Sequence, residues 1–112
     1  MKIYISGPMN GIKDFNFPMF DRVAAEYRRL GYEVFSPADN DRKLFGTNDI
    51  SEITKKSTYR ECLAEDVNWI CKHAEIMVML PGWEKSKGAL IEWSLANCLD
   101  IPIHYWTQSS AP

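Results

Sequence analysis

Cysteine and histidine are scarce in this 112-residue chain, which holds only Cys62, Cys71, Cys98, His73 and His104. No two cysteines have CxxC spacing and their number is odd, so neither a disulfide framework nor a zinc site is expected. We therefore predict that the protein binds no metal and keeps free thiols in a reducing cytoplasm.

The chain also lacks a long apolar run, a run of like charge and an internal repeat. Its start, MKIYISGPMNG, has one lysine and an apolar stretch too short for a signal peptide or a membrane span, which predicts a cytoplasmic protein without membrane contact. The net charge of −2 argues against a nucleic-acid partner, because such domains carry a basic face. Gly7 and Gly11 form neither a GxGxxG nor a Walker A motif, and no cofactor is expected.

The composition that remains is typical of one globular domain, with 46% hydrophobic and 25% charged residues. We predict a single domain at residues 1–106 and a flexible tail at 107–112. Four tryptophans, five tyrosines and five phenylalanines are many for this length. Some of them are expected to line a pocket or a subunit contact, and a homodimer or larger homo-oligomer is the expected assembly.

Hydrophobic periodicity and turn residues divide the chain into alternating strands and helices. Strands are predicted at 2–6, 33–36, 75–80 and 101–105, and helices at 18–30, 58–73 and 88–99. Pro18 suits the first turn of the first helix and Gly31 its end, while Thr58 and Glu61 match a capping box. Residues 37–57 are polar and irregular, which favours a functional loop or lid, with a short helix near 50–53 as a possible addition.

This order of elements predicts an α/β fold with helices on both faces of a parallel sheet. Right-handed connections give a flavodoxin-like three-layer sandwich with four strands in the order 2-1-3-4. In such folds the ligand binds at the carboxyl ends of the strands, near the switch in strand order. Residues 7–11, 37–39 and 81–87 are therefore expected around one crevice.

Two acidic residues lie on the apolar faces of the last two predicted helices. On a helical wheel Glu92 shares a face with Leu95 and Ala96, and Asp66 lies in the middle of an apolar stripe. An unpaired buried carboxylate costs several kcal/mol. Each acid is therefore either partnered structurally, for Asp66 by a backbone amide or Tyr4, or directed into a polar cavity.

Three motifs in this order resemble the nucleoside 2-deoxyribosyltransferase superfamily, which includes the 2′-deoxynucleoside 5′-phosphate N-hydrolases, and the likeness covers nearly the whole chain. They are Ile3-Tyr4-Ile5-Ser6-Gly7-Pro8-Met9, Asp66-Val67-Asn68-Trp69 and Ser86-Lys87-Gly88-Ala89-Leu90-Ile91-Glu92. The chain is most similar to the short members of this group common in phages and prophages. The resemblance implies cleavage of the N-glycosidic bond of a 2′-deoxynucleoside or deoxynucleotide. It implies that Glu92 is the nucleophile, Asp66 the active-site aspartate, Tyr4 the residue that orients Glu92, and Ser86 a phosphate-binding residue.

One loop departs from the N-hydrolases, which carry Ser and Arg after the glycine that corresponds to Gly7. This chain has Pro8 and Asn10 there, and Pro8 has no N–H to donate to an anion, which argues against a 5′-phosphate site at this loop. Residues 85–88, with two lysines and the start of a helix, are either an alternative anion site or a solvated loop.

Other residues around the predicted crevice have both a functional and a structural interpretation. Gly7 permits a tight turn where a ligand approaches; Trp83 stacks on a base or packs; Met9 contacts the base or packs within its loop; and Asp39 contacts the sugar or the base, or serves a turn. The residues predicted to bind substrate are Gly7, Pro8, Met9, Asn10, Asp39, Trp83, Ser86 and Gly88.

Three functions compete at this stage. The first is an N-glycosidase or deoxyribosyltransferase, and the second is a non-catalytic nucleotide-binding module, a sensor or sponge, on the same fold. The third is an interaction domain without a small-molecule role. The third predicts that Glu92 is exposed or held in a salt bridge, whereas the first requires a cavity beside an inward-facing Glu92.

Overall fold

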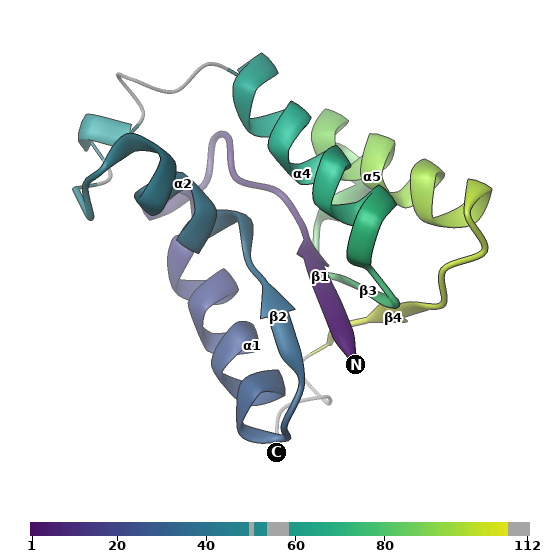
Figure 1. The fold of residues 1–112 in the computed structure, drawn as a ribbon. Helices are drawn as coiled ribbons and strands as arrows, with labels where there is room; N and C mark the ends of the chain where they lie inside the picture. Colours follow the sequence, from purple (N-terminus) through teal and green to yellow (C-terminus); the bar gives the residue numbers. More distant parts are fainter. Residues whose placement is uncertain (50, 54–58, 108–112) are drawn as a thin grey trace.

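The computed structural model describes residues 1–49, 51–53 and 59–107, which form one α/β unit (Figure 1). Its elements are β1 (Lys2–Ser6), η1 (Lys13–Asn16), α1 (Phe17–Arg29), β2 (Glu33–Phe35), α2 (Pro37–Phe45), α4 (Tyr59–His73), β3 (Ile76–Met79), η2 (Trp83–Lys85), α5 (Lys87–Cys98) and β4 (Ile103–Tyr105). These bounds agree with the predicted strands and long helices to within three residues at each end.

The four strands form one parallel sheet in the order β2-β1-β3-β4. Central strand β1 pairs with β2 through Tyr4 and Phe35 and with β3 through Tyr4 and Met77. The predicted flavodoxin-like fold and strand order are confirmed. The switch in strand order lies between β1 and β3, because β2 is added on one side of β1 and β3 on the other. The carboxyl ends of β1 and β3 lie at the same edge of the sheet.

Side chains of β1 alternate between two hydrophobic cores, one on each face of the sheet. Ile3 and Ile5 pack with Phe20 and Val23 of α1, while Tyr4 packs on the opposite face with residues of α4 and α5. Figure 1 shows α4 and α5 side by side on that face. Ser6 lies two positions after Tyr4 on β1, so the side chains of Tyr4 and Ser6 both point toward α5.

The predicted loop at 37–57 is wrong over its first half, which forms helix α2. Pro37 occupies the first turn and Gly46, with φ of 69°, ends the helix in the left-handed conformation. Ala38 and Asp41 are buried. The inward face of α2 therefore carries the acid Asp41 at a position where an apolar residue would have shown the helical period. This is why the sequence predicted an irregular segment.

The rest of that segment is described only in part. Residues 51–53 are helical, within the range suggested for a short helix, and Ile53 is fully buried in the core. Ile50 and the capping-box residue Thr58 lie outside the described residues, as do 108–112 of the predicted tail. Among the helices that are described, none is long and apolar enough to cross a membrane.

Candidate active site

A cleft of about 1010 Å³ lies at the carboxyl ends of β1 and β3. Its walls come from the loop after β1, the start and first turns of α2, one face of α4, the loop after β3 and the first turns of α5. The lining residues are Gly7, Pro8, Met9, Asn10, Ile12, Phe15, Phe20, Pro37, Asp41, Cys62, Leu63, Asp66, Pro81, Gly82, Lys85, Ser86, Lys87, Gly88, Ala89 and Glu92. Most of the segments predicted to surround one crevice therefore do so.

Glu92 of α5 is directed into this cleft with only 6% of its surface exposed. The Tyr4 hydroxyl donates a hydrogen bond to its Oε2 at 2.9 Å, and the Ser6 hydroxyl donates one to its Oε1 at 2.6 Å. Two donors from alternate positions of a buried strand therefore fix both carboxylate oxygens. Tyr4 is itself held by stacking on Phe35, with ring centroids 5.4 Å apart.

Burial raises the pKa of Glu92 from 4.5 to about 7, while the hydrogen bonds from Ser6 and Tyr4 hold it lower than burial alone would. No ion pair to Glu92 occurs among the described residues. Burial, and next the Glu92 carboxylate, raise the pKa of the Tyr4 phenol well above its usual value, so Tyr4 stays a hydrogen-bond donor. At neutral pH a substantial fraction of Glu92 is therefore ionised beside an open cavity.

Asp66 of α4 shares the cleft and is 7% exposed. Its Oδ1 is buried and has no hydrogen-bond partner within the described part of the chain. Burial raises its pKa to about 8, with further increases from the charges of Glu92 and Asp41, whereas a hydrogen bond with Tyr4, the structural partner considered above, lowers it. Burial raises the pKa of both acids, and the charge of Glu92 raises that of Asp66 further, so the two groups favour sharing one proton. A pair of buried acids that holds one proton suits the roles of proton donor and nucleophile.

The loop after β1 approaches β3 closely, and Gly7 makes this approach possible. A Cβ at position 7 would lie 2.7 Å from the Cβ of Leu80, which is nearer than non-bonded carbons tolerate. The carbonyl of Pro8 accepts a hydrogen bond from the Asn16 side chain at 2.9 Å, which ties the loop to the start of α1. Gly7, Pro8, Met9 and Asn10 all line the cleft, as their assignment to substrate binding requires.

Ser86 and Gly88 line the opposite wall, at the start of α5. The Ser86 hydroxyl oxygen caps the helix by accepting a hydrogen bond from the Ala89 backbone N–H at 3.2 Å. Lys85 and Lys87 border the same wall. Two cations beside a helix N-terminus provide positive potential at this end of the cleft.

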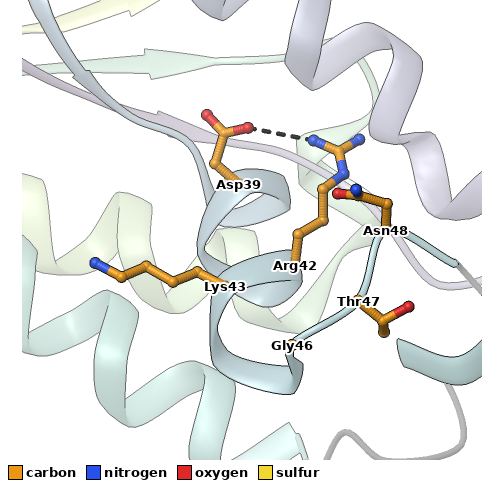
Figure 2. A pocket seen from close by; sticks show the side chains of 6 residues that line it. All are labelled: Asp39, Arg42, Lys43, Gly46, Thr47 and Asn48. Atoms are coloured by element: carbon orange, nitrogen blue, oxygen red, sulfur yellow. Dashed lines mark hydrogen bonds and ion pairs between the residues drawn. The ribbon is translucent and has the colours of Figure 1, made fainter.

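Two residues predicted to bind substrate do not line the cleft. Asp39 borders a separate hollow of about 430 Å³ along α2. Its carboxylate forms ion pairs with Arg42 (Figure 2) at 3.2 Å and with Arg28 at 2.8 Å. Both arginines satisfy its carboxylate, and α2 turns it away from Glu92. Trp83 stacks on Trp93, with ring centroids 5.4 Å apart, in an aromatic cluster beside α5, which matches the packing interpretation.

The site also includes polar residues that the sequence patterns did not single out: Asp41 and Cys62 line the cleft, and the buried Ser6 bonds to Glu92 behind it. Ser6 lies two positions after Tyr4 on the same strand, and residues two apart on a strand face the same side. The sequence could therefore have predicted that Ser6 faces Glu92 as Tyr4 does. Asp41 was missed because α2 was not predicted, whereas Cys62 lies on the predicted helix α4 but was not assigned to the site. Among the described residues, no group of three or more His, Cys, Asp or Glu side chains is placed to hold a metal ion.

The family model of a domain of unknown function, DUF4406, matches residues 1–105 of the chain. No curated protein and no solved structure matches the chain.

Proposed function

We propose that this chain, which belongs to the DUF4406 family, cleaves the N-glycosidic bond of a 2′-deoxynucleoside or deoxynucleotide through a covalent intermediate on Glu92. The observation that carries the proposal is the state of Glu92. It is buried, unpaired with any cation of the described chain, held through both oxygens by Tyr4 and Ser6, and open to a cleft large enough for a nucleoside. The motifs shared with the deoxyribosyltransferase superfamily support the same assignment.

In the first step a Glu92 carboxylate oxygen forms a bond to C1′ of the sugar as the bond from C1′ to the base nitrogen breaks. Asp66 donates its proton to the departing base, so that no free base anion is released. The product is a neutral base and a glycosyl ester on Glu92. Dividing one difficult displacement into two lowers the barrier of each, since both pass through an oxocarbenium-like state.

In the second step an acceptor attacks C1′ and the bond to Glu92 breaks. The Asp66 carboxylate takes a proton from the acceptor, which returns both acids to their starting states. Water as acceptor gives hydrolysis, and a second base gives transfer. The hydrogen bonds from Tyr4 and Ser6 hold Glu92 in one rotamer during attack and stabilise its charge when it leaves.

The test is to incubate the protein with 2′-deoxynucleosides and their 5′-monophosphates and to measure free base by chromatography. The proposal predicts base release that Glu92→Gln abolishes and that Asp100→Asn, an exposed substitution after α5 and outside the cleft, leaves intact. Thermal stabilisation by a nucleoside without base release would instead identify a non-catalytic binding module. Neither release nor stabilisation would refute both interpretations.

A further inference from the structure

Asp41 is a third acidic side chain in the cleft, and the proposed reaction does not use it. It projects from α2, is 2% exposed and lines the cleft. Its Oδ1 is buried without a hydrogen-bond partner among the residues that the structure describes. A buried acceptor that faces a cavity and has no partner in the protein is satisfied when a ligand supplies a donor.

The position of Asp41 follows from its neighbour on α4. Cys62 and Asp66 are four residues apart on that helix and therefore lie one turn apart on the same face. The Cys62 thiol forms a hydrogen bond with the Asp41 carboxyl group. Asp41 is thus about one helical turn from Asp66. The charges of Glu92 and Asp41 both raise the pKa of Asp66, so Asp66 lies close to each of the other two acids.

The proposed reaction sets where the base would lie relative to Asp41. In the proposed reaction C1′ of the sugar lies at Glu92, and the base nitrogen that leaves C1′ lies at Asp66. The outer edge of the base then extends toward Asp41. We propose that Asp41 determines base specificity, selecting 2′-deoxynucleosides whose base carries an exocyclic amine; this inference rests on the proposed function.

The chemistry of the two partners supports this selection. Burial raises the pKa of Asp41 to about 6, so the group is mainly ionised at neutral pH and only accepts hydrogen bonds. An exocyclic amine, as in cytosine and adenine, donates an N–H to such an oxygen. A keto oxygen in its place, as in uracil, would bring two acceptors together and leave both unsatisfied.

The experiment compares affinities by calorimetry in the Glu92→Gln protein, which holds substrate without turnover. The ligand pairs are 2′-deoxycytidine against 2′-deoxyuridine, and 2′-deoxyadenosine against purine 2′-deoxyriboside, which lacks the amine. We expect the amine-bearing member to bind tighter by about 10- to 100-fold, the range for leaving one buried polar group unpaired. Adding Asp41→Asn, whose amide also donates, should reduce the cytidine-to-uridine ratio at least ~10-fold.

Asp100→Asn is the matched control, because Asp100 is exposed, lies after α5 and outside the cleft, and has a positive φ of 57° that asparagine tolerates. Its affinity ratios should equal those of the Glu92→Gln parent. Equal binding within both ligand pairs would overturn the inference even if Asp41→Asn fails to fold. So would uniform weakening of all four ligands by Asp41→Asn, which would indicate a contact to the sugar. Base release without nucleobase preference would refute this inference alone, whereas absence of any nucleoside binding would refute the proposed function with it.

Discussion

Replacing Glu92 with glutamine should make the protein more stable, and the gain should depend on pH. The carboxyl group has a pKa of about 7 in the folded protein and 4.5 as a model value. The folded state therefore binds more protons than the unfolded state between these values. The stability contribution of Glu92 is greatest below pH 4.5, falls as pH rises through about 7, and is constant at its lowest value above that.

The magnitude follows from the difference of about 2.5 between the two pKa values, which at about 1.36 kcal/mol each gives a maximal gain of ~3 kcal/mol. Glutamine retains one acceptor oxygen, so it loses one of the two hydrogen bonds from Tyr4 and Ser6, at a cost of about 1 kcal/mol. The net gain above pH 7 is about 2 kcal/mol. Removing the Glu92 charge also lowers the pKa of Asp66, which acts in the same direction.

Urea denaturation of both proteins at pH 4.5, 6, 7 and 8 measures this gain as the difference in unfolding free energy. The account predicts that Glu92→Gln is no more stable than the parent at the lowest of these pH values and progressively more stable up to neutral pH. A difference that stays constant with pH, or a glutamine variant that is less stable at pH 8, would refute the claim that burial holds Glu92 at a raised pKa.

Three further predictions concern the neighbours of Glu92. Asp66→Asn should abolish base release and also stabilise the fold at pH 7, because the pKa of Asp66 is raised from 3.8 to about 8; a less stable variant at pH 7 in urea, or retained release, would contradict this. Ser6→Ala should move the ascending limb of the pH–rate profile to higher pH and reduce kcat about 10-fold, because the Ser6 hydrogen bond lowers the pKa of Glu92; an unshifted limb would show that the bond does not act on ionisation. Gly7→Ala should destabilise the protein by about 1–3 kcal/mol, because the new Cβ meets Leu80 at 2.7 Å; an unchanged thermal midpoint would show that the loop relaxes freely.

Much of the fold was predictable because most elements obey one period. The apolar run of β3 is short and followed by Pro81, which favours a buried strand, and the spacing in α1 is helical. Parallel strands with right-handed connections then leave few arrangements. Helix α2 was not predictable in this way, because Asp41 occupies its inward face. The residue that concealed the helix is the one now proposed to contact substrate. A local rule is broken there because the side chain faces a cavity and not the core.

The part of the candidate site that could be predicted consists of acidic residues on apolar helix faces. Glu92 and Asp66 could be predicted because an acid in an apolar stripe requires an explanation. Their place in the fold could be predicted because ligands of such folds bind at the carboxyl ends of the strands. Asp39 and Trp83 could not be placed from the sequence alone, since their positions depend on tertiary partners. The arginines that bind Asp39 come from α1 and α2, and the aromatic cluster that holds Trp83 comes from α5 and β4.

The most direct test of the central claim is to look for the sugar on Glu92. The protein is mixed with a 2′-deoxynucleoside that it cleaves, quenched in acid within the first turnover, digested and sequenced by mass spectrometry. The account predicts a deoxyribosyl group esterified to Glu92 in the peptide from α5, formed with one equivalent of free base and absent from Glu92→Gln. Base released at full rate with no sugar on Glu92, or with the sugar on another residue, would contradict it.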